Sequence, residues 1–547
     1  MYNKLLLPIA ALLAMSACKF RQKVDLIIHH ATIYTVNNGF DTAQAMAIRD
    51  GKIIAIGSND ELLKNYEAAE EKNAVGGYIY PGFIDAHAHF YNYGLSLNKV
   101  DLTGTQSWAE CLQRIRDFVT ANPPRSGEWI TGRGWDQNDW TVKDFPDRAA
   151  LDSLLPNNPA LFSRVDGHAA IANAAAIAIA KLQPGQTLVG GELETANNRL
   201  TGILVDNAVD LVSAIIPPPN KEQQFAGLLA AQKNCFAVGL TSVVDCGLLK
   251  NEVEAIDEIQ KKGELKMRIN ALLTDSSVNY DHYLKAGPYK TERLNVNAFK
   301  LYADGALGSR GACLLHPYAD KPGWYGFLLK DKNYYRQVAE KLYAANFQMC
   351  THAIGDSANR EILHIYADIL KGKNDRRWRI EHAQVINPAD FNSFGQYNII
   401  PSVQPTHATS DMYWAAQRLG PDAVKGAYAW QQLLQQNQWI PLGTDFPVED
   451  ISPFKTFFAA VVRQDAKGFP QGGFQIENGL SRQDALRGMT IWAAKGSFEE
   501  KEKGSLETGK YADFIILDKD LLRCPNAEIL NTKVLATYVN GERVYGK

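Results

Sequence analysis

Short apolar runs rich in β-branched and aromatic residues recur along the middle of this chain, with amphipathic stretches of helical periodicity between them. This alternation is typical of repeated β/α units around a parallel sheet. Eight runs are candidate strands: Tyr78–Ala86, Thr241–Asp245, Met267–Leu273, Asn297–Tyr302, Gln348–His352, Trp378–His382, Ile399–Val403 and Ile440–Thr444. Their number and spacing predict an α/β fold, a distorted (β/α)8 barrel whose reactive residues lie at the carboxyl ends of the strands.

Both ends of the chain carry strand-like alternation. It covers residues 24 to 57, and it returns near the carboxyl end, where Asn540-Gly541 between two β-rich runs indicates a hairpin. Because a hairpin alone is marginally stable, we predict that residues 24–77 and 500–547 together build one small composite β-sandwich domain. The barrel then spans residues 78–499, with insertions at about 101–216 and 304–326 where the β/α pattern is interrupted.

The amino terminus has the pattern of an export signal. Lys4 precedes an apolar run that is too short to span a bilayer, and Ser16 and Ala17 precede Cys18. The end of this segment resembles a bacterial lipobox, so we expect residues 1–17 to be a signal peptide, Cys18 to be lipidated and residues 18–23 to be a tether. The protein would then be exported to the cell envelope and touch the membrane only through its lipid. An ordinary signal peptide with an incidental cysteine is the alternative.

Composition narrows the function classes. The chain has 547 residues and a formal net charge of -3, so no long-range field of one sign favours nucleic acid, and we expect no nucleic-acid partner. Its seven cysteines include no CxxC pair. A cysteine zinc site is therefore not indicated, and a metal would need other ligands.

Histidine and aspartate residues stand at the predicted strand ends. His87 and His89 are two positions apart on the first strand, so their side chains would project to one side. His352, His382 and Asp445 each close a later strand. Four imidazoles and one carboxylate at one end of a barrel match the ligand preference of Zn²⁺.

Several segments together carry a family resemblance. PGFIDAHAHF, KLYADGALGSRGA, THAIGD, IEHAQ, GTDFPV and GSLETGKYADFIILD occur in this order. The chain resembles the amidohydrolase superfamily, specifically the family 3 branch of N-substituted formamide deformylase-like enzymes. This resemblance implies a metal-dependent hydrolase built on a distorted TIM barrel with a composite β domain.

Lys300 lies inside an apolar predicted strand, where a lysine ammonium is rarely buried without a partner. The resemblance implies that this lysine reacts with CO₂ to give a carbamate that bridges two metal ions. The reaction needs the neutral amine, which we expect burial and nearby cations to favour by lowering the lysine pKa. The alternative is an ion pair of Lys300 with Asp304 or with a substrate carboxylate.

The resemblance also implies the ligand sets. His87, His89, Lys300 and Asp445 would hold one metal ion, and Lys300, His352 and His382 the other. Zn²⁺ is the expected metal, although one or two ions, or another divalent transition metal, remain open. A metal-bound hydroxide would attack the substrate carbonyl, and Asp445 would take up its proton and pass it to the leaving nitrogen. Asp445, Lys300 and His382 are thus the expected catalytic residues.

Five further residues are candidates for substrate binding. His168, Trp135 and Asp136 lie in the first insertion, Arg310 lies in the glycine-rich second insertion, and His407 follows the Ile399–Val403 strand. Each has a plain structural alternative: a loop histidine, aromatic packing or an arginine that braces its loop.

These observations predict a hydrolase of carbon–nitrogen bonds other than peptide bonds, with a small-molecule N-acyl or N-formyl amide as substrate. A cyclic amide, imide or lactone hydrolase is the alternative among enzymes, because the same nucleophile attacks any suitable carbonyl. A non-catalytic envelope solute-binding lipoprotein is the alternative outside them. The oligomeric state stays open, a homodimer included.

Overall fold

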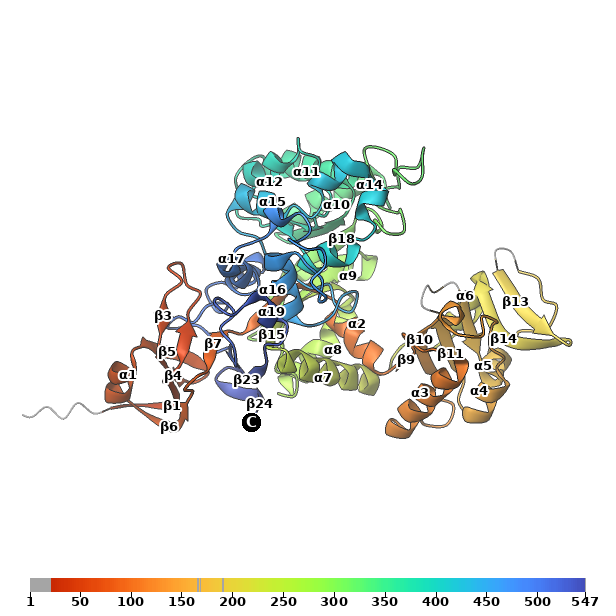
Figure 1. Ribbon diagram of the computed structural model, residues 1–547, viewed down its shortest axis with the longest axis horizontal. Coiled ribbons are helices and arrows are strands. Elements are labelled where there is room, and N and C mark those ends of the chain that lie inside the picture. The colour runs from red at the N-terminus through yellow and green to blue at the C-terminus, as the bar shows by residue number, and fades with distance from the viewer. Residues whose placement is uncertain (1–20, 165–166, 168, 189–190, 547) are drawn as a thin grey trace, which may run out of the picture. The chain divides into compact units, whose positions relative to one another are not determined.

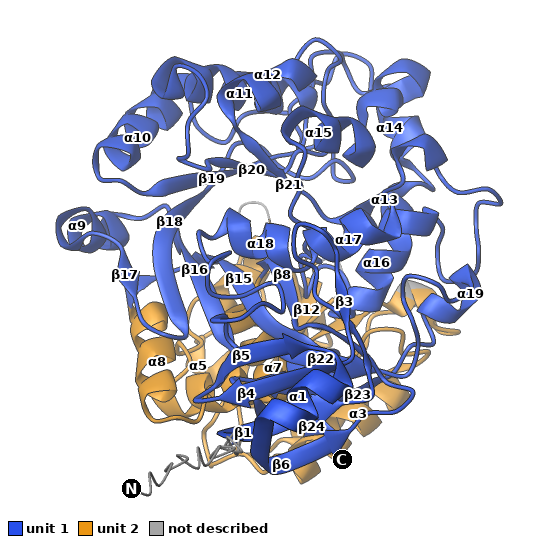
Figure 2. Ribbon diagram, turned by 90° about the vertical axis from the view of Figure 1, so that its left-hand side faces the viewer, with its two compact units in different colours: residues 1–88, 234–250, 266–547 blue, residues 89–233, 251–265 orange. Residues whose placement is uncertain are grey.

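The computed structural model describes residues 21–164, 167, 169–188 and 191–546. The chain divides into two compact units (Figure 2). The first comprises residues 1–88, 234–250 and 266–547, and the second comprises residues 89–233 and 251–265. The predicted signal peptide and residues 18–20 of the predicted tether, Cys18 included, lie outside the described residues.

Seven parallel strands form the barrel of the first unit, and Figure 2 labels each of them, whereas Figure 1 labels β15 and β18. In spatial order they are β21 (Ile400–Ser402), β20 (Arg379–His382), β19 (Gln348–Ala353), β18 (Leu294–Tyr302), β16 (Arg268–Thr274), β15 (Leu240–Leu248) and β8 (Phe83–Ala88). Small and branched side chains of four neighbouring strands fill part of the interior, among them Val244, Leu272, Ala298 and Cys350. The predicted α/β barrel is therefore confirmed.

The eighth predicted strand, Ile440–Thr444, closes this barrel without forming a regular strand. It makes a single parallel bridge, Val403 with Leu442. The amide of Gly443 donates to the carbonyl of Val403 at 3.0 Å, and the amide of Ala86 donates to that of Leu442 at 3.1 Å. The segment thus joins β21 to β8, and it brings the residues that follow it to the same barrel end as His87.

Helices cover the outside of the barrel, and their sequence explains their position. In α10 (Lys332–Ala344), Asp331 accepts hydrogen bonds from the first turn, and Tyr335, Val338, Ala339 and Leu342 form a buried stripe. The other barrel helices are α9 (Ser277–Ala286), α11 (Asp356–Leu370), α12 (Phe391–Tyr397), α13 (Pro405–Asp411), α14 (Ala415–Ala423), α15 (Trp430–Asn437), α16 (Pro453–Val462), α17 (Arg482–Gly488) and α18 (Ile491–Gly496).

Strands from the two ends of the chain pair with each other. One sheet has the order β24 (Glu542–Gly546), β23 (Val534–Val539), β22 (Phe514–Leu517), β7 (Tyr78–Pro81), β2 (Thr32–Tyr34) and β3 (Thr42–Ala43). A second has the order β5 (Lys52–Gly57), β4 (Ala45–Arg49), β1 (Gln22–His29) and β6 (Tyr66–Asn73). A shared core that includes Ile33, Ile48, Phe514 and Tyr538 lies between them.

The predicted strand Tyr78–Ala86 is two strands. β7 belongs to the terminal sheet and β8 to the barrel, and the chain crosses between them at Gly82. A Cβ at Gly82 would lie 2.3 Å from Thr241 Oγ1, so only glycine fits this close approach. The Pro81-Gly82 pair is a local turn signal at this crossing, within a run that is otherwise mostly apolar.

The second unit has its own sheet. Its order is β13 (Gly191–Ala196), β14 (Arg199–Asp206), β12 (Ala169–Ala172), β11 (Ala160–Arg164), β10 (Ile130–Trp135) and β9 (Val100–Asp101). Helices α3 (Trp108–Ala121), α4 (Ala149–Leu154), α5 (Ala174–Ile179) and α6 (Asn207–Ser213) accompany it. Its hydrophobic side chains form two clusters, around Trp135 and around Leu204. The first predicted insertion is therefore a folded α/β unit rather than a long loop.

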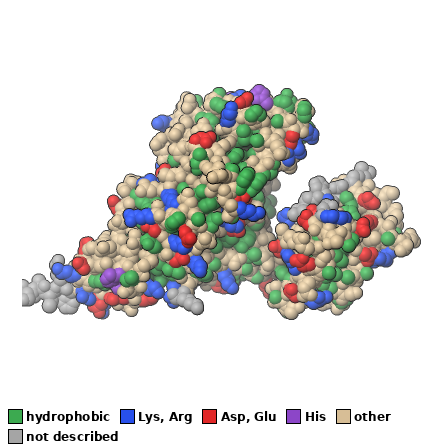
Figure 3. Space-filling view, viewed as in Figure 1, with side chains coloured by type: hydrophobic (Ala, Val, Ile, Leu, Met, Phe, Trp, Pro, Cys, Tyr) green, Lys and Arg blue, Asp and Glu red, His purple; other side chains and the backbone are tan. Residues whose placement is uncertain are grey.

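The surface carries charges of both signs. On the face drawn in Figure 3, Lys and Arg side chains are interspersed with Asp and Glu. Within the described ranges, no helix combines the length and the apolar character that crossing a lipid bilayer requires.

Candidate active site

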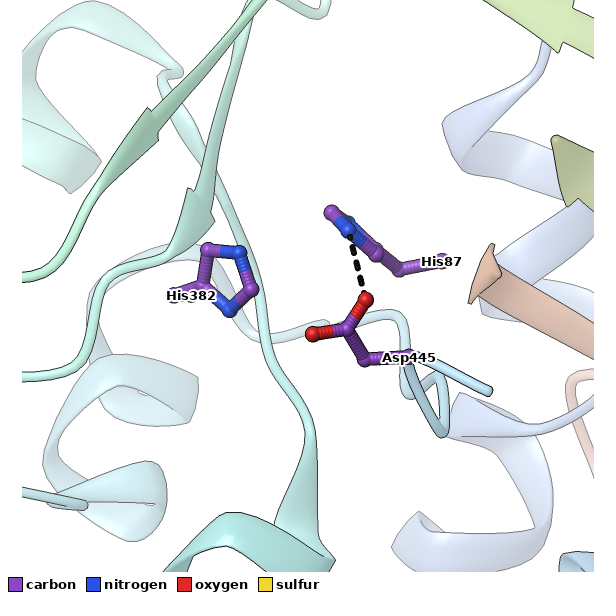
Figure 4. Close-up of side chains that lie close together, drawn as sticks. All are labelled: His87, His382 and Asp445. Atoms are coloured by element: carbon purple, nitrogen blue, oxygen red, sulfur yellow. Dashed lines mark ion pairs between the residues drawn. The ribbon is translucent and has the colours of Figure 1, made fainter. Parts of the chain in front are cut away.

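Three buried side chains meet at the carboxyl end of the barrel. His87 lies on β8, His382 ends β20, and Asp445 follows the bridging segment. One ligand atom from each lies within 4.8 Å of the other two. Figure 4 shows the three side chains pointing toward one another, with His87 Nε2 3.5 Å from Asp445 Oδ1. Two imidazoles and one carboxylate in this arrangement could hold a divalent metal ion.

Two of these residues have an unusual backbone. His382 has φ 69° and Asp445 has φ 65°, a left-handed conformation that is uncommon outside glycine. The amide of Asp445 donates to the carbonyl of His87 at 2.7 Å, which fixes the loop against β8. Strained residues of this kind persist where the surrounding structure holds them, often at functional sites.

Asp85 is a buried carboxylate that accepts hydrogen bonds from the segments carrying His87 and Asp445. One of its oxygens accepts hydrogen bonds from the amides of His87 at 3.1 Å and Thr444 at 3.0 Å. The other accepts from the Thr444 hydroxyl at 2.6 Å. Burial raises the pKa of Asp85 to about 7, against the lowering effect of these donors. This residue joins the strand of His87 to the loop of Asp445.

Glu381 orients the ring of His87. Its carboxylate lies 2.5 Å from His87 Nδ1 and accepts from Arg379 Nε at 2.6 Å, and all three side chains are fully buried. Although burial opposes ionisation, the Arg379 cation holds the pKa of Glu381 far below its usual range. Because Nδ1 faces a carboxylate, Nε2 is the nitrogen that points to Asp445. A carboxylate behind a metal-binding histidine fixes its tautomer and orientation.

Lys300 lies beside the same histidine. Its side chain is fully buried, and Nζ lies 3.3 Å from His87 Nε2. Burial acts to lower the lysine pKa, but the combined influence of Cys246, Tyr302, Glu381 and Asp445 raises it. The direction expected from the sequence was therefore wrong, because the neighbouring acidic groups had not been foreseen. Asp304, the predicted alternative partner, accepts hydrogen bonds from three backbone amides, those of Cys313, Ile354 and Gly355.

His352 adjoins the group of three. It lies on β19, and its ring centroid is 4.5 Å from that of His382. Burial and the Lys300 cation lower the pKa of His352 to about 3, and burial together with Lys300 lowers that of His87 to about 4. Burial also lowers the pKa of His382 well below its usual value. All three imidazoles are therefore neutral near pH 7, the form that binds metal.

Two buried ring nitrogens without hydrogen-bond partners indicate whether these residues could bind a metal ion. Among the described residues, His352 Nε2 and His382 Nδ1 are buried and have no hydrogen-bond partner. The carboxylate nearest to His352 Nε2 belongs to Asp304 at 3.6 Å, beyond hydrogen-bond reach. Buried polar atoms without partners are rare in proteins, and a metal ion would satisfy both. The donor set therefore fits a transition metal.

His407 contacts Asp445 from α13. Its Nε2 lies 3.3 Å from Asp445 Oδ2, and its Nδ1 lies 3.3 Å from Glu449 Oε1. Burial acts to lower the pKa of His407, but the hydrogen bonds to the two carboxylates raise it to about 10. Ser410 donates to the same Glu449 oxygen at 2.7 Å, so the carboxylate is held on both sides.

The other predicted residues lie in these places. His89 follows β8 as the N-cap residue of α2 (Phe90–Leu97) and belongs to the second unit. Arg310 binds both oxygens of Asp320, at 3.0 and 2.8 Å, which matches the bracing alternative. Trp135 is buried and donates to the carbonyl of Phe162. Asp136 follows it in the second unit, and His168 lies outside the described residues.

Sequence reasoning missed Glu381, Arg379, Asp85 and Glu449. Glu381 and Glu449 contact His87 and His407, which lie far from them in the sequence, so no local motif connects these pairs. One signal was present: Arg379 and Glu381 alternate along a short apolar strand, and charged residues are almost never fully buried unless paired. That pattern predicts a partner for each residue but does not identify it.

Known proteins share this architecture. A profile described as the amidohydrolase family matches residues 70–545. The protein LONG AFTER FAR-RED 3 of Arabidopsis thaliana is 34% identical over 95% of this chain and 91% of its own length. N-substituted formamide deformylase of Arthrobacter pascens is 25% identical over 95% and 98% of the two chains.

A solved structure extends this similarity to three dimensions. A metal-dependent hydrolase of Pyrococcus horikoshii has a TM-score of 0.78 and 27% identity, over 92% of this chain and 99% of that one. The family match covers most of the chain, including the segments that carry His87, His382 and Asp445. The chain belongs to the amidohydrolase family, and it is a metal-dependent hydrolase.

Proposed function

We propose that the protein hydrolyses a carbon–nitrogen bond other than a peptide bond, in a small N-formyl or N-acyl amide. The observation that carries the proposal is the buried group of His87, His382 and Asp445 at the carboxyl end of the barrel, with its ligand atoms within 4.8 Å of one another. In barrels of this kind the reacting groups come from strand ends and the loops after them. The 25% identity to an N-substituted formamide deformylase supports the amide class.

We further propose that the resident cofactor is Zn²⁺, as one or two ions. His87, His382 and Asp445 would hold an ion, with His352, Lys300 and, as the sequence predicts, His89 completing the set. A zinc ion bound there supplies a Lewis acid and lowers the pKa of a water molecule toward neutrality. The neutral imidazoles at this site are ready to bind without first losing a proton.

Asp445 and His407 are the proposed residues for proton transfer and for orientation of the substrate. The Asp445 carboxylate faces His87 with one oxygen and His407 with the other, so it is placed to accept a proton and pass it toward the leaving nitrogen. His407, held by Glu449, can orient that carboxylate or the substrate carbonyl. Because the pKa of His407 is raised to about 10, its ring acts as a donor near pH 7.

Lys300 is the proposed carbamate residue. Its amine lies at the strand end beside His87, where a carbamate would replace a buried cation by an anion. Addition of CO₂ to the neutral amine forms the new carbon–nitrogen bond and releases one proton. Labelling with ¹³C bicarbonate tests this step, because wild type should show a carbamate resonance that Lys300→Ala lacks. Full activity and metal content in Lys300→Ala would contradict the carbamate proposal while leaving the hydrolase function intact.

Substrate recognition extends the proposal. His168, Trp135 and Asp136 of the second unit are proposed substrate contacts, and His407 is proposed to contribute from the barrel. Arg310 is a weaker candidate, since Asp320 already occupies its guanidinium.

We also propose that Cys18 is lipidated and keeps the protein in the cell envelope. Incorporation of labelled fatty acid by wild type but not by Cys18→Ala tests that point.

One assay tests the function directly. Zinc-loaded protein is given N-formyl, N-acetyl and cyclic amides, with amine release and bound metal measured in wild type, His382→Ala and Asp445→Asn. We expect amine release from an open-chain amide, and a loss of at least about 100-fold in both variants. His364→Ala is the matched control, because His364 is an exposed histidine on α11. Turnover of cyclic substrates alone would favour the cyclic amide hydrolase, and no turnover by metal-replete protein would contradict the proposal.

A further inference from the structure

Arg463 is a fully buried cation outside the site described above. It follows α16 as its C-cap residue, with φ 60°, and its side chain has no exposed surface. Its Nε donates to the carbonyl of Phe474 at 2.8 Å. Its two terminal nitrogens, NH1 and NH2, are buried and have no hydrogen-bond partner among the described residues.

No described carboxylate forms an ion pair with this guanidinium. The guanidinium carbon lies 5.6 Å from the centre of the Phe474 ring, and Tyr428 and Glu477 are the groups that influence it electrostatically. Glu477 is exposed, and the Tyr428 hydroxyl donates to Asp411 at 2.8 Å. Buried charges in proteins are almost always paired, so Arg463 is an exception that needs an explanation.

Arg463 keeps its charge in this place. Burial lowers the pKa of its guanidinium to about 10, against the raising influence of Glu477 and Tyr428. A group with that pKa remains protonated near pH 7. The buried guanidinium is therefore a cation without a counter-ion among the described residues.

A second unused donor lies in the same part of the fold. Trp430 begins α15, and its indole Nε1 is buried without a partner in the described chain. The Tyr428 ring centroid is 6.0 Å from that of Trp430 and 6.0 Å from that of Phe474. Donors therefore outnumber acceptors here. The one unpartnered acceptor of this segment is Gln475 Oε1, which makes ordered water the rival occupant.

We propose that Arg463 binds a small monovalent anion, of the size of a halide or formate, in the wall of the barrel between the end of α16 and the Phe474 segment. NH1 and NH2 form a two-pronged donor that suits such an anion. The anion neutralises the buried guanidinium and stabilises this part of the barrel. The proposal does not depend on which amide the enzyme hydrolyses, since Arg463 belongs to none of the predicted ligand or substrate residues.

Anion exchange at constant ionic strength tests this site. The thermal midpoint of zinc-loaded wild type is followed while sodium gluconate, whose anion is too large to be enclosed, is replaced by sodium chloride. A ligand that binds only the folded state raises the midpoint progressively, with the logarithm of its concentration above Kd, and we expect a rise of about 2 °C. Arg463→Met should abolish the rise, whereas Arg336→Met, at an exposed arginine paired with Asp368, should keep it.

Crystals grown in bromide provide a readout that does not need the variant to fold. Wild-type crystals should show an anomalous peak in contact with Arg463 NH1 and NH2. A formate-grown crystal distinguishes a carboxylate from a halide as the preferred anion, and either result supports the site. Water density at both nitrogens without anomalous signal, or an equal chloride effect in wild type and Arg463→Met, would overturn the proposal.

Discussion

At the scale of single residues, the pair of Glu381 and Arg379 decides how His87 is presented. Glu381 uses one oxygen for His87 and the other for Arg379, and nothing at this position is exposed to water. Glu381→Gln removes the negative charge. It also places the amide NH₂ group, a donor, against either His87 Nδ1 or Arg379 Nε, which both donate to the carboxylate. We expect metal affinity to fall about 10- to 100-fold. Unfolding stability should fall by about 3 kcal/mol, since a buried charge loses its partner.

Zinc titration and urea unfolding of the metal-free protein measure these two effects. Glu528→Gln is the control, because Glu528 pairs with Lys519 at a half-exposed site where the charge contributes little. Unchanged zinc affinity in Glu381→Gln would show that the orientation of His87 does not depend on this carboxylate.

The low pKa values of the site histidines predict how metal binding depends on pH. A proton competes for an imidazole nitrogen only below the pKa of that imidazole. The pKa is about 4 for His87 and about 3 for His352. Both rings therefore stay neutral as the pH falls through 6.5, the usual pKa of a histidine side chain. Protonation of these two rings should therefore weaken zinc affinity by less than about tenfold in total between about pH 7 and pH 5. Competition with a chelator of known pH dependence measures this slope, and a steep fall beginning near pH 6.5 would contradict it.

The three grouped residues can be proposed as metal ligands from the sequence because chemistry and position coincide in them. His87, His382 and Asp445 are metal-binding residue types that each stand at or just after a barrel strand. Their supporting residues were not predictable, because Glu381 and Asp85 resemble any carboxylate until their partners are known. The raised pKa of Lys300 was missed for the same reason: the acidic groups around it come from distant segments.

At the scale of elements, the closure of the barrel between Leu442 and Ala86 positions Asp445 against His87. Gly443 stands at this contact, and a Cβ added there would lie 2.5 Å from the His87 amide nitrogen and 2.8 Å from Asp85 Oδ1. Gly443→Ala must therefore displace backbone. We expect a loss of about 1 to 3 kcal/mol in unfolding stability and reduced zinc binding, although no ligand is removed.

Gly496→Ala is the matched control for this change. The nearest atom to its added Cβ would be Pro441 Cγ at 3.8 Å, an ordinary contact, and Gly496 lies at the end of α18. Alanine there should be neutral or slightly stabilising. Denaturant unfolding and zinc content of both variants provide the measurement. Wild-type zinc content in Gly443→Ala would show that the ligands do not depend on this closure.

The strand pattern predicted seven barrel strands close to their observed positions, and it failed where tertiary structure overrides periodicity. The run Tyr78–Ala86 is continuous in sequence, yet Gly82 divides it between two sheets. Ile440–Thr444 is apolar enough for a strand, but it forms only one bridge. Both deviations lie next to β8, where the barrel closes, and each run contains a proline and a glycine that mark an interruption, Pro81-Gly82 in the first and Pro441 with Gly443 in the second.

At the scale of the whole molecule, the two units carry different parts of the predicted site. His87, His382 and Asp445 all belong to the first unit, whereas His89, Trp135 and Asp136 belong to the second. The second unit also has hydrophobic clusters of its own. None of the proposed metal ligands lies within residues 101–216, so removing that segment should separate metal binding from substrate choice.

Replacing residues 101–216 by a short flexible linker tests this separation. The entropic cost of closing a loop changes only slowly with the length of the loop. We therefore expect the barrel to remain folded after this replacement. We expect the shortened protein to retain the zinc content of wild type, as its three grouped ligands are intact, and to change its relative rates across the amide panel. Metal analysis and the panel are measured on the same preparation, with Asp445→Asn as the variant that loses metal while keeping the second unit. If the shortened protein is folded but has lost its zinc, the second unit helps to form the metal site, and the assignment of all grouped ligands to the first unit would be insufficient.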